Sequence, residues 1–470
     1  MAITLTQAPS IPFDQVYGAN PITLSGLSTI SPLPNKYVLQ IVRGGQVIGD
    51  IRQAPNSIGS AIFDIQNILQ NFVSSSPNNI ELLGTVGKKL MNGGNESVQY
   101  QIRYGYETSG VVAGLTTTAV KYLSIGGTKA YYQVPYPNSE FIPIVNNAGP
   151  CSSVTMQGKP FSDMVSYRTA EQITDGRPTF LRGEMRVYDH YVTRDDMETI
   201  SYWNEPTVTG SVPNNTKSIE AFTIWQYNAV GVPATPVTIY NTIPNGGGPN
   251  ALPSAGSAMV YPYFAITAGV GPKNIAASLL PSTTHYYVVT NAYTYPNGCV
   301  SIIQGLGDAP MHYVHRFNII EEGCNDFPEI QVSWLNSYGF RDYYSFRKRH
   351  DRNVSINRNT YLKEAANYNS ASYNVNIYDR GTTTYSEDLG QEFVAFTDFL
   401  TDAEALFLEK LFISADVKVR FNGSQVGQQF QWQPVTLMNK TYTEKTVRKN
   451  QLFQYDITFR MAHNIKSQRG

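Results

Sequence analysis

The stretch that decides the fold is Glu329-Ile-Gln-Val-Ser-Trp-Leu-Asn-Ser-Tyr-Gly-Phe-Arg-Asp-Tyr-Tyr-Ser-Phe346. Ile330, Val332 and Trp334 alternate with polar residues, and this period of two predicts a strand with one buried face. The Asn-Ser-Tyr-Gly run at 336–339 predicts a turn, and the aromatic residues after it predict a second strand that returns beside the first. We therefore expect a hairpin at the aromatic centre of a β-sandwich or barrel. Its predicted core residues are Trp334, Tyr344 and Phe346.

The same period of two recurs towards both ends of the chain. Residues 37–42 and 47–51 flank Gly44-Gly45, which predicts a hairpin with a two-residue turn. Apolar and aromatic residues alternate from 98 to 106, whereas residues 57–73 mix two periods and predict a strand followed by one short helix. Near the C-terminus, Thr401-Asp-Ala-Glu404 has the pattern of a capping box at the start of an apolar helix. The predicted fold class is mainly β, with several β-sandwich or barrel-like modules and a small C-terminal α+β domain.

Changes in pattern along the chain predict five regions. Residues 205–280 are rich in Gly, Pro and Asn and carry only isolated apolar pieces, so we interpret them as an inserted small β region or long loops that contact a partner. The predicted regions are an N-terminal β domain (1–108), a second β region (109–204), the insertion (205–280), a central β domain (281–385) and the C-terminal α+β domain (386–470).

The composition favours burial against other proteins. Charged residues make up 15% of the 470 residues, below the roughly 25% of an average soluble domain, and 32 residues are Tyr. Tyr brings both apolar area and a hydroxyl group, which suits protein–protein interfaces, although many strands also produce such a composition. The formal net charge is −1, so no overall field attracts nucleic acid or an anionic membrane.

Cysteine usage and the N-terminus indicate a protein made in a cytoplasm. Cys151, Cys299 and Cys324 are odd in number and widely spaced, so they do not form a disulfide framework. The first residues lack the basic and apolar regions of a secretory signal, and no apolar run approaches the roughly 18 residues that a membrane-spanning helix needs. We expect no membrane span.

No motif of an enzyme is present. The chain lacks a Gly-x-Ser-x-Gly elbow, a phosphate-binding loop and a dinucleotide fingerprint. His312 and His315, with Cys324 further on, resemble metal ligands, but on a strand two residues three apart point to opposite faces. The adjacent carboxylates at 195–196 and 321–322 diverge for the same reason, although carboxylates distant in sequence can still meet. We predict no catalytic residues, no metal and no cofactor.

One basic run follows the central hairpin. It contains Arg347, Lys348, Arg349 and Arg352, with aromatic residues just before it. We expect the aromatic side chains to face the core and the cations to face solvent or an acidic neighbour. An interface with another subunit is the second interpretation, and contact with nucleic acid is the third, because the chain as a whole is not basic.

Three groups of residues resemble a known class of proteins. The N-terminal group is Asn20-Pro-Ile22, Lys36-Tyr-Val38, Gly59-Ser-Ala-Ile-Phe-Asp-Ile65 and Ile68-Leu69. The central group is Phe317-Asn-Ile-Ile-Glu-Glu-Gly-Cys324 followed by the stretch from Ile330 to Phe346. The C-terminal group is Leu400-Thr-Asp-Ala-Glu404, Ser414-Ala-Asp-Val-Lys-Val419, Pro434-Val435 and Phe453 to Phe459. Together they resemble virion structural proteins of tailed bacteriophages, particularly those of crAss-like and other Bacteroidetes phages. Residues 205–280 have no counterpart, and Phe340 stands where the pattern more often has Gly.

The resemblance implies a non-enzymatic tail-hub or ring subunit, located in the virion tail, that assembles with itself and with tail, neck or portal-proximal proteins. It also implies that Arg347, Lys348, Arg349 and Arg352 line a channel for DNA or contact an adjoining ring. Three alternatives remain: a capsid decoration protein, a polysaccharide-degrading enzyme, and a receptor- or glycan-binding tail appendage. In the last, aromatic residues on loops would stack on sugars, namely Trp225, Tyr227, Tyr293 and Tyr295.

Overall fold

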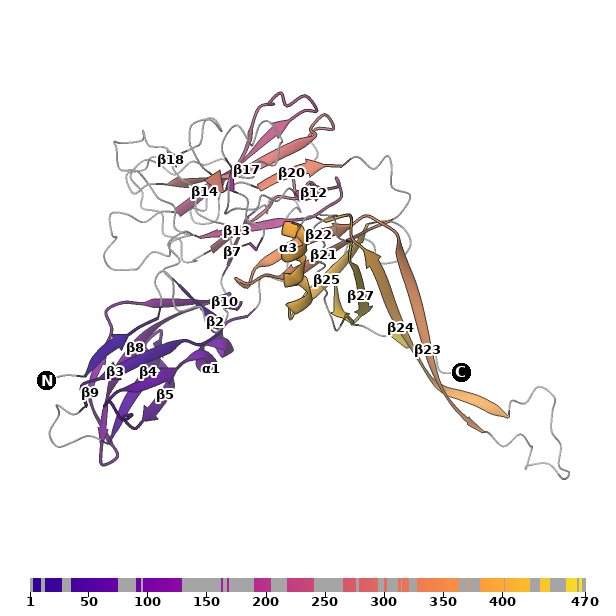
Figure 1. Cartoon of the computed structure of the whole chain (residues 1–470). Coiled ribbons are helices and arrows are strands. Elements are labelled where there is room, and N and C mark those ends of the chain that lie inside the picture. The colour runs from indigo at the N-terminus through magenta and orange to yellow at the C-terminus, as the bar shows by residue number, and fades with distance from the viewer. Residues whose placement is uncertain are drawn as a thin grey trace. The chain divides into compact units, whose positions relative to one another are not determined.

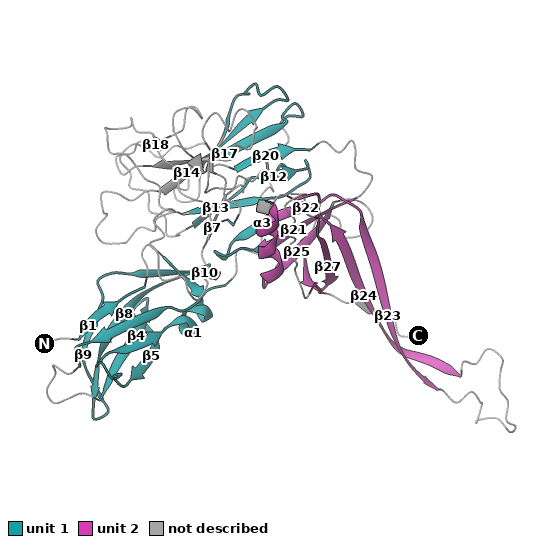
Figure 2. Ribbon diagram, viewed as in Figure 1, with its two compact units in different colours: residues 1–322, 335–342 teal, residues 323–334, 343–470 magenta. Residues whose placement is uncertain are grey.

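The computed structural model confirms the mainly-β fold class. It describes residues 3–9, 13–27, 35–74, 90–93, 96–128, 162–163, 167–168, 190–203, 218–240, 265–275, 279–294, 300–301, 312–313, 315–320, 328–362, 371, 381–400, 402–422, 432–439, 454–462 and 465–466. Within these ranges no helix is long and apolar enough to cross a membrane. The chain forms two compact units, one of residues 1–322 with 335–342 and the other of residues 323–334 with 343–470 (Figure 2).

Unit 1 begins with two sheets (Figure 1). The smaller has three strands, in the order β1 (Thr4–Gln7), β3 (Pro21–Ser25) and β6 (Ala61–Asp64). The larger has six: β2 (Asp14–Tyr17), β10 (Tyr122–Thr128), β8 (Ser97–Thr108), β4 (Lys36–Arg43) and β5 (Gln46–Gln53) in that order, with β9 (Val111–Thr117) also paired to β8. Because β9 and β10 continue this sheet, it extends to Thr128 and past the predicted boundary at 108, which falls inside the β8–β9 hairpin.

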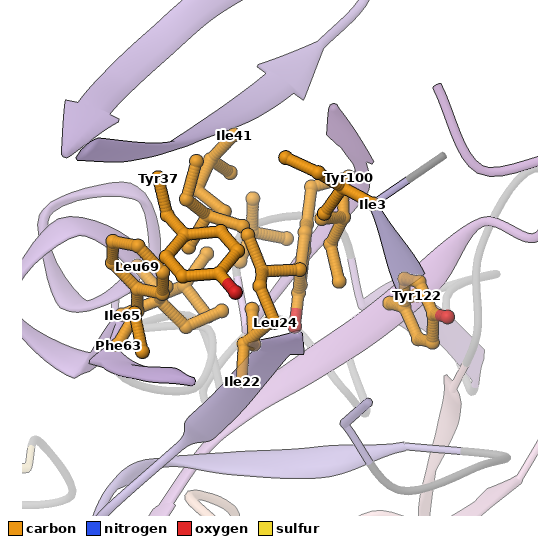
Figure 3. Packing of buried hydrophobic residues seen from close by; sticks show 14 of the residues in the cluster. Ile3, Ile22, Leu24, Tyr37, Ile41, Phe63, Ile65, Leu69, Tyr100 and Tyr122 are labelled. Atoms are coloured by element: carbon orange, nitrogen blue, oxygen red, sulfur yellow. The ribbon is translucent and has the colours of Figure 1, made fainter. Parts of the chain in front are cut away.

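These two sheets share one hydrophobic core (Figure 3). Ile22 and Leu24 enter it from β3, and Tyr37 and Tyr100 enter it from β4 and β8. The buried Tyr37 hydroxyl donates to the Gly59 carbonyl oxygen at 2.5 Å and accepts from the backbone of Leu27 at 3.0 Å. This ring therefore contributes apolar area without leaving a buried polar group unpaired.

Two local predictions for this region are confirmed. Gly44 and Gly45 both have positive φ, 55° and 85°, as a two-residue hairpin turn requires, and β4 pairs with β5 around them. The strand β6 leads into the short helix α1 (Gln66–Leu69) and the 3-10 helix η2 (Gln70–Phe72).

The remainder of unit 1 is a second pair of sheets. The larger has the order β12 (His190–Val192), β20 (His315–Ile319), β17 (Tyr286–Thr294), β14 (Ser218–Tyr227) and β15 (Val237–Tyr240), with β18 (Val300–Ser301) paired to β17. The smaller has the order β13 (Thr199–Trp203), β16 (Ala265–Gly269) and β7 (Leu90–Gly93). A two-stranded pair joins β11 (Tyr167–Arg168) to β19 (His312–Tyr313).

Residues 205–280, which were predicted to be an inserted small β region or long loops, contribute strands to a core sheet. The described strands in this range are core strands, because β14 pairs with both β15 and β17, and residues 222–227 are all buried. Phe222 and Ile224 pack in one cluster with Tyr287 and Phe317. A strand that is buried on both faces lacks the alternation of apolar and polar residues, so its sequence was interpreted only as an isolated apolar segment.

The described residues of unit 2 form one sheet of eight strands and one helix. The order is β22 (Arg341–Phe346), β21 (Glu329–Leu335), β25 (Val417–Asn422), β26 (Gln433–Leu437), β27 (Asp456–Met461), β24 (Thr382–Phe396) and β23 (His350–Leu362), with β28 (Ile465–Lys466) paired to β24. The helix is α3 (Asp402–Ile413). The predicted domain boundary at 385 therefore falls within a continuous sheet, because β24 runs across it and pairs with strands from both predicted domains.

The predicted core residues of this sheet differ in burial. Trp334 and Phe346 are fully buried, as predicted, and the Trp334 ring lies 4.9 Å from the ring of Phe407 on α3. Tyr344 is half-buried, and its ring meets that of Phe346 edge to face with the centroids 4.9 Å apart. Thr401, which the capping-box prediction needs, lies outside the described residues.

The predicted central hairpin is confirmed, and its turn belongs to unit 1. The Asn336 side-chain oxygen accepts from the backbone N–H groups of Tyr338 and Phe340, each at 3.0 Å, and the Asn336 backbone donates to the Phe340 carbonyl at 2.7 Å. Gly339 has a φ of 82° and packs against the backbone of Gly126. Phe340 is buried in a cluster with Phe13, Leu123, Ile125 and Ala265.

Candidate functional site: an exposed two-stranded ribbon

The β23–β24 pair forms a long ribbon that projects from the rest of unit 2 (Figure 1). The two strands pair antiparallel from His350 opposite Ala395 to Leu362 opposite Thr382, with one irregularity between 359 and 360. Only the proximal part of β24 has further partners among the described residues, because β28 pairs with 388–389 and β27 pairs with 392–396. The distal part of the ribbon is two strands wide.

The ribbon exposes large apolar side chains to solvent. Every residue from 352 to 362 is exposed. The exposed fraction is 52% for Ile356 and 81% for Leu362, and the Tyr361 and Tyr385 rings contact each other at 6.2 Å on the surface. A two-stranded hairpin without further packing is marginally stable in water, and contiguous exposed apolar residues mark interaction sites.

The two faces of the ribbon differ in character. The pairing register places one wholly polar set on one face: Asn353, Ser355, Asn357, Asn359, Ser386, Asp388, Gly390 and Glu392. The other face carries Arg352, Val354, Ile356, Arg358, Glu387, Leu389, Gln391 and Phe393. At the proximal end Phe393 is buried, with its ring 4.9 Å from Phe421 and 5.5 Å from Phe459. The apolar face of the ribbon therefore continues the core face of the sheet.

Charge is also distributed unevenly between the two strands. The exposed part of β23 carries Arg352 and Arg358, whereas β24 carries Glu387, Asp388 and Glu392. Arg358 Nε donates to Glu387 Oε1 across the strands at 3.0 Å. The ribbon thus has one cationic strand and one acidic strand.

The four predicted basic residues do not stay together. Arg347 is buried, and its Nε lies 4.0 Å from Glu329 Oε1 and 3.9 Å from Asp398 Oδ2. Lys348, Arg349 and Arg352 are exposed where β23 begins. Arg347 is therefore not one of the cations that could face a channel or a neighbour, because its guanidinium group lies inside unit 2.

A buried acidic cluster in unit 1 joins residues 162–163 to the hairpin turn. Ser162 Oγ donates to Asp342 Oδ1 at 2.6 Å, and the Asp163 backbone donates to Asp342 Oδ2 at 2.9 Å. The Ser337 backbone in turn donates to Asp163 Oδ2 at 2.8 Å. Burial, with the nearby Asp163 carboxylate, raises the pKa of Asp342 to about 8. The fold therefore favours a protonated Asp342.

We expect this cluster to make unit 1 less stable as the pH rises from about 4 to about 8. In that window the folded state holds a proton on Asp342 that the unfolded state, with the ordinary pKa of 3.8, has lost. Because the folded state binds more protons, its free energy of unfolding falls with rising pH. Urea unfolding of the wild type and of Asp342→Asn across this window measures the effect. The difference between the two proteins should change with pH, and parallel curves would contradict the assignment.

The histidine considered as a metal ligand has another partner. His315 Nδ1 lies 3.1 Å from His190 Nε2, and His190 Nδ1 lies 3.0 Å from Glu198 Oε2. Burial, and to a lesser extent His190, lowers the pKa of His315 well below its ordinary value. In the part of the chain that the structure describes, no group of three His, Cys, Asp or Glu residues is arranged to hold a metal. Cys151, Cys299 and Cys324 lie outside that part.

The carboxylates at 195 and 196 diverge as expected. Asp195 forms an ion pair with Lys273, whereas Asp196 accepts from the backbone of Thr193 at 2.8 Å. Glu321 and Glu322 fall outside the described residues.

Two of the four residues suggested for sugar stacking are buried rather than displayed on the surface. Trp225 and Tyr227 are buried, and Tyr227 stacks on Tyr286 with ring centroids 4.7 Å apart. The Arg316 guanidinium lies 3.9 Å from the centroid of the Tyr286 ring. The side chain of Tyr293 and the whole of Tyr295 lie outside the description.

Comparisons with known proteins leave the family open. No protein-family model and no curated protein matches the chain. Among solved structures, extracellular domains 3–5 of Drosophila OTK match over 83% of this chain and 92% of that chain, with 9% sequence identity and a TM-score of 0.17. A TM-score this low supports no conclusion about fold or function.

Proposed function

We propose that the chain is a structural subunit of the tail hub or tail ring of a tailed-phage virion, where it assembles with itself and with neighbouring virion proteins. The motifs of the two ends and the central hairpin support the phage assignment. The observation that carries the assembly role is the β23–β24 ribbon, whose apolar face continues the core of unit 2 into solvent. The role needs no catalytic residue.

The exposed backbone edge and apolar side chains of the ribbon favour assembly with another chain. An edge strand with unpaired backbone groups is a template for another chain, and folded proteins usually shield such edges. Here the exposed strand β23 is long, and Val354 and Ile356 on it are about half exposed, at 45% and 52%. Addition of a strand from a neighbour would pair the backbone and cover these side chains.

The exposed cations near the start of β23 suit a second contact. Lys348, Arg349 and Arg352 are the residues that would face DNA in a central channel or the acidic surface of an adjoining ring. Lys348 and Arg349 already lie beside carboxylates, at 3.3 Å from Asp398 and 2.9 Å from Asp351. Particles in which all three are changed to Glu should lose assembly or DNA delivery. Normal particles would remove this part of the proposal.

The mass of the protein in two states tests the proposed function. We expect a monomer in dilute solution by light scattering. In purified particles, stoichiometric mass spectrometry should give a copy number equal to a small multiple of a ring symmetry, because heterologous contacts between identical subunits close into rings. A trimer in dilute solution would instead indicate a receptor-binding fibre. A copy number as large as that of the capsid subunit would indicate a decoration protein, and absence from particles would refute the proposal.

A further inference from the structure

Both long edges of the distal ribbon lack a strand partner among the described residues. Among the described residues β23 is the last strand of the sheet, so no described strand pairs with its outer edge. Described strands pair with the outer side of β24 only from residue 388 onwards, so none pairs with the outer edge of 382–387. Each ribbon therefore offers two different edges for strand addition.

The direction of the strands determines which edges match. Two ribbons that lie side by side and point the same way bring β23 of one against β24 of the next, because β23 and β24 run antiparallel within each ribbon. That contact is an antiparallel ladder, the more stable kind. Pairing β23 with β23 of another copy, with Val354 opposite Ile356, would place Arg352 opposite Arg358, and like charges directly opposite are destabilising.

Charge favours the same arrangement. Arg358 lies on the β23 edge, and Glu387 lies on the stretch of the β24 edge that has no outer partner among the described residues. With two ribbons level, Arg358 would stand between Glu387 of its own copy, already 3.0 Å away, and Glu387 of the next copy. The ribbon as a whole is close to neutral, which suits a protein neighbour of the same kind better than nucleic acid.

Exposed apolar side chains also lie along the edges that would meet. In the stretch where β24 has no outer partner among the described residues, these are Tyr361 and Leu362 on β23 and Tyr385 on β24. The two-stranded distal ribbon would then become part of a wider sheet that covers these side chains, and a sheet of three or more strands is more stable in water than a lone hairpin.

We infer that the β23–β24 ribbons join copies of this chain edge to edge, with β23 of one copy paired antiparallel to the distal part of β24 of the next. The contact uses two different edges, so it is heterologous and can close into a ring. The inference rests on the proposed function, for which it names the partner, a second copy of the chain, and the edges that meet.

Photo-cross-linking between labelled copies tests the pairing. The full-length chain would carry p-benzoylphenylalanine in place of Leu362, which is 81% exposed and level with the distal part of β24, and isotopically heavy and light protein would be mixed at high concentration. We expect mixed heavy–light cross-links from position 362 to residues 382–387. The same reagent at Ile58, which is 83% exposed in unit 1, should give none. Cross-links that are confined to a single copy, or that reach another region, would overturn the inference.

A charge exchange provides a second test that needs no reagent. Arg358→Glu should abolish self-association in sedimentation velocity at the same concentration, and Arg358→Glu combined with Glu387→Arg should restore it. Because Arg358 and Glu387 are surface residues, circular dichroism should show both variants folded. Association that is unchanged in the single variant would contradict the pairing.

The outcomes separate this inference from the proposed function. If mixed cross-links form but the protein is absent from purified particles, the pairing stands and the virion role is refuted. If particles contain the chain but position 362 is cross-linked to a different virion protein, the virion role stands and the pairing is refuted.

Discussion

Trp334→Ala is expected to lower the free energy of unfolding of unit 2 by about 3–5 kcal/mol, because truncation of a buried Trp loses its transfer free energy and leaves a cavity. Trp334 is fully buried on β21, and its ring packs against Phe407 of α3. The substitution therefore loosens the contact between the helix and the sheet.

Urea unfolding followed by far-ultraviolet circular dichroism, together with hydrogen exchange in α3, measures this loss. Phe399→Ala is the matched control in the same unit, because Phe399 is 64% exposed and its removal should change stability by less than about 0.5 kcal/mol. If the two variants unfolded at the same urea concentration, Trp334 would not be the centre of this core.

Gly339→Ala is expected to destabilise unit 1 by about 3 kcal/mol or more, because a strained backbone and a steric overlap act together. The φ of 82° is unfavourable for any L side chain, and an added Cβ would overlap the Gly126 carbonyl oxygen. That oxygen belongs to the backbone of β10, so it cannot rotate away as a side chain would.

Gly44→Ala is the control for the backbone term alone. Gly44 also has positive φ, at 55°, but an added Cβ meets no atom within 4 Å. Gly44→Ala should therefore lower the free energy of unfolding by only about 1 kcal/mol in the same urea experiment. Equal losses in the two variants would mean that the turn at 336–340 does not pack against β10 as described.

Strands in which apolar and polar residues alternate were predictable from the sequence. The alternation from 98 to 106 and from 330 to 334, and the glycine turn at 44–45, correspond to β8, β21 and the β4–β5 hairpin. The expectation that β21 buries only one face is wrong, because Gln331 and Ser333 are buried as well. β14 was not predictable in this way, because Phe222 to Tyr227 are buried on both faces and show no period of two. The sheets also cross the predicted boundaries, because partners distant in sequence complete them: β21 pairs with β25, on the other side of the boundary at 385.

The candidate site was only partly predictable. Trp334 and Phe346 were correctly assigned to the core, but Arg347 was expected among exposed cations, and its burial depends on Glu329 and Asp398, which lie on other segments. The ribbon was missed altogether. Val354 and Ile356 alternate with Asn and Ser, which is the pattern of a strand. A strand that packs on no core has few apolar residues, so this segment was interpreted as polar.

The strand β7 has a consequence for how unit 1 acquires its structure. Leu90 to Gly93 pair with Ala268 to Ala265, so a strand from early in the chain completes a sheet whose other members come much later. Closing so long a loop is entropically costly, and folds dominated by such distant contacts form slowly. During synthesis β7 must wait for β16 to leave the ribosome. A fragment that starts after residue 128 would lack the third strand of that sheet, so the two halves of unit 1 are expected to mature together.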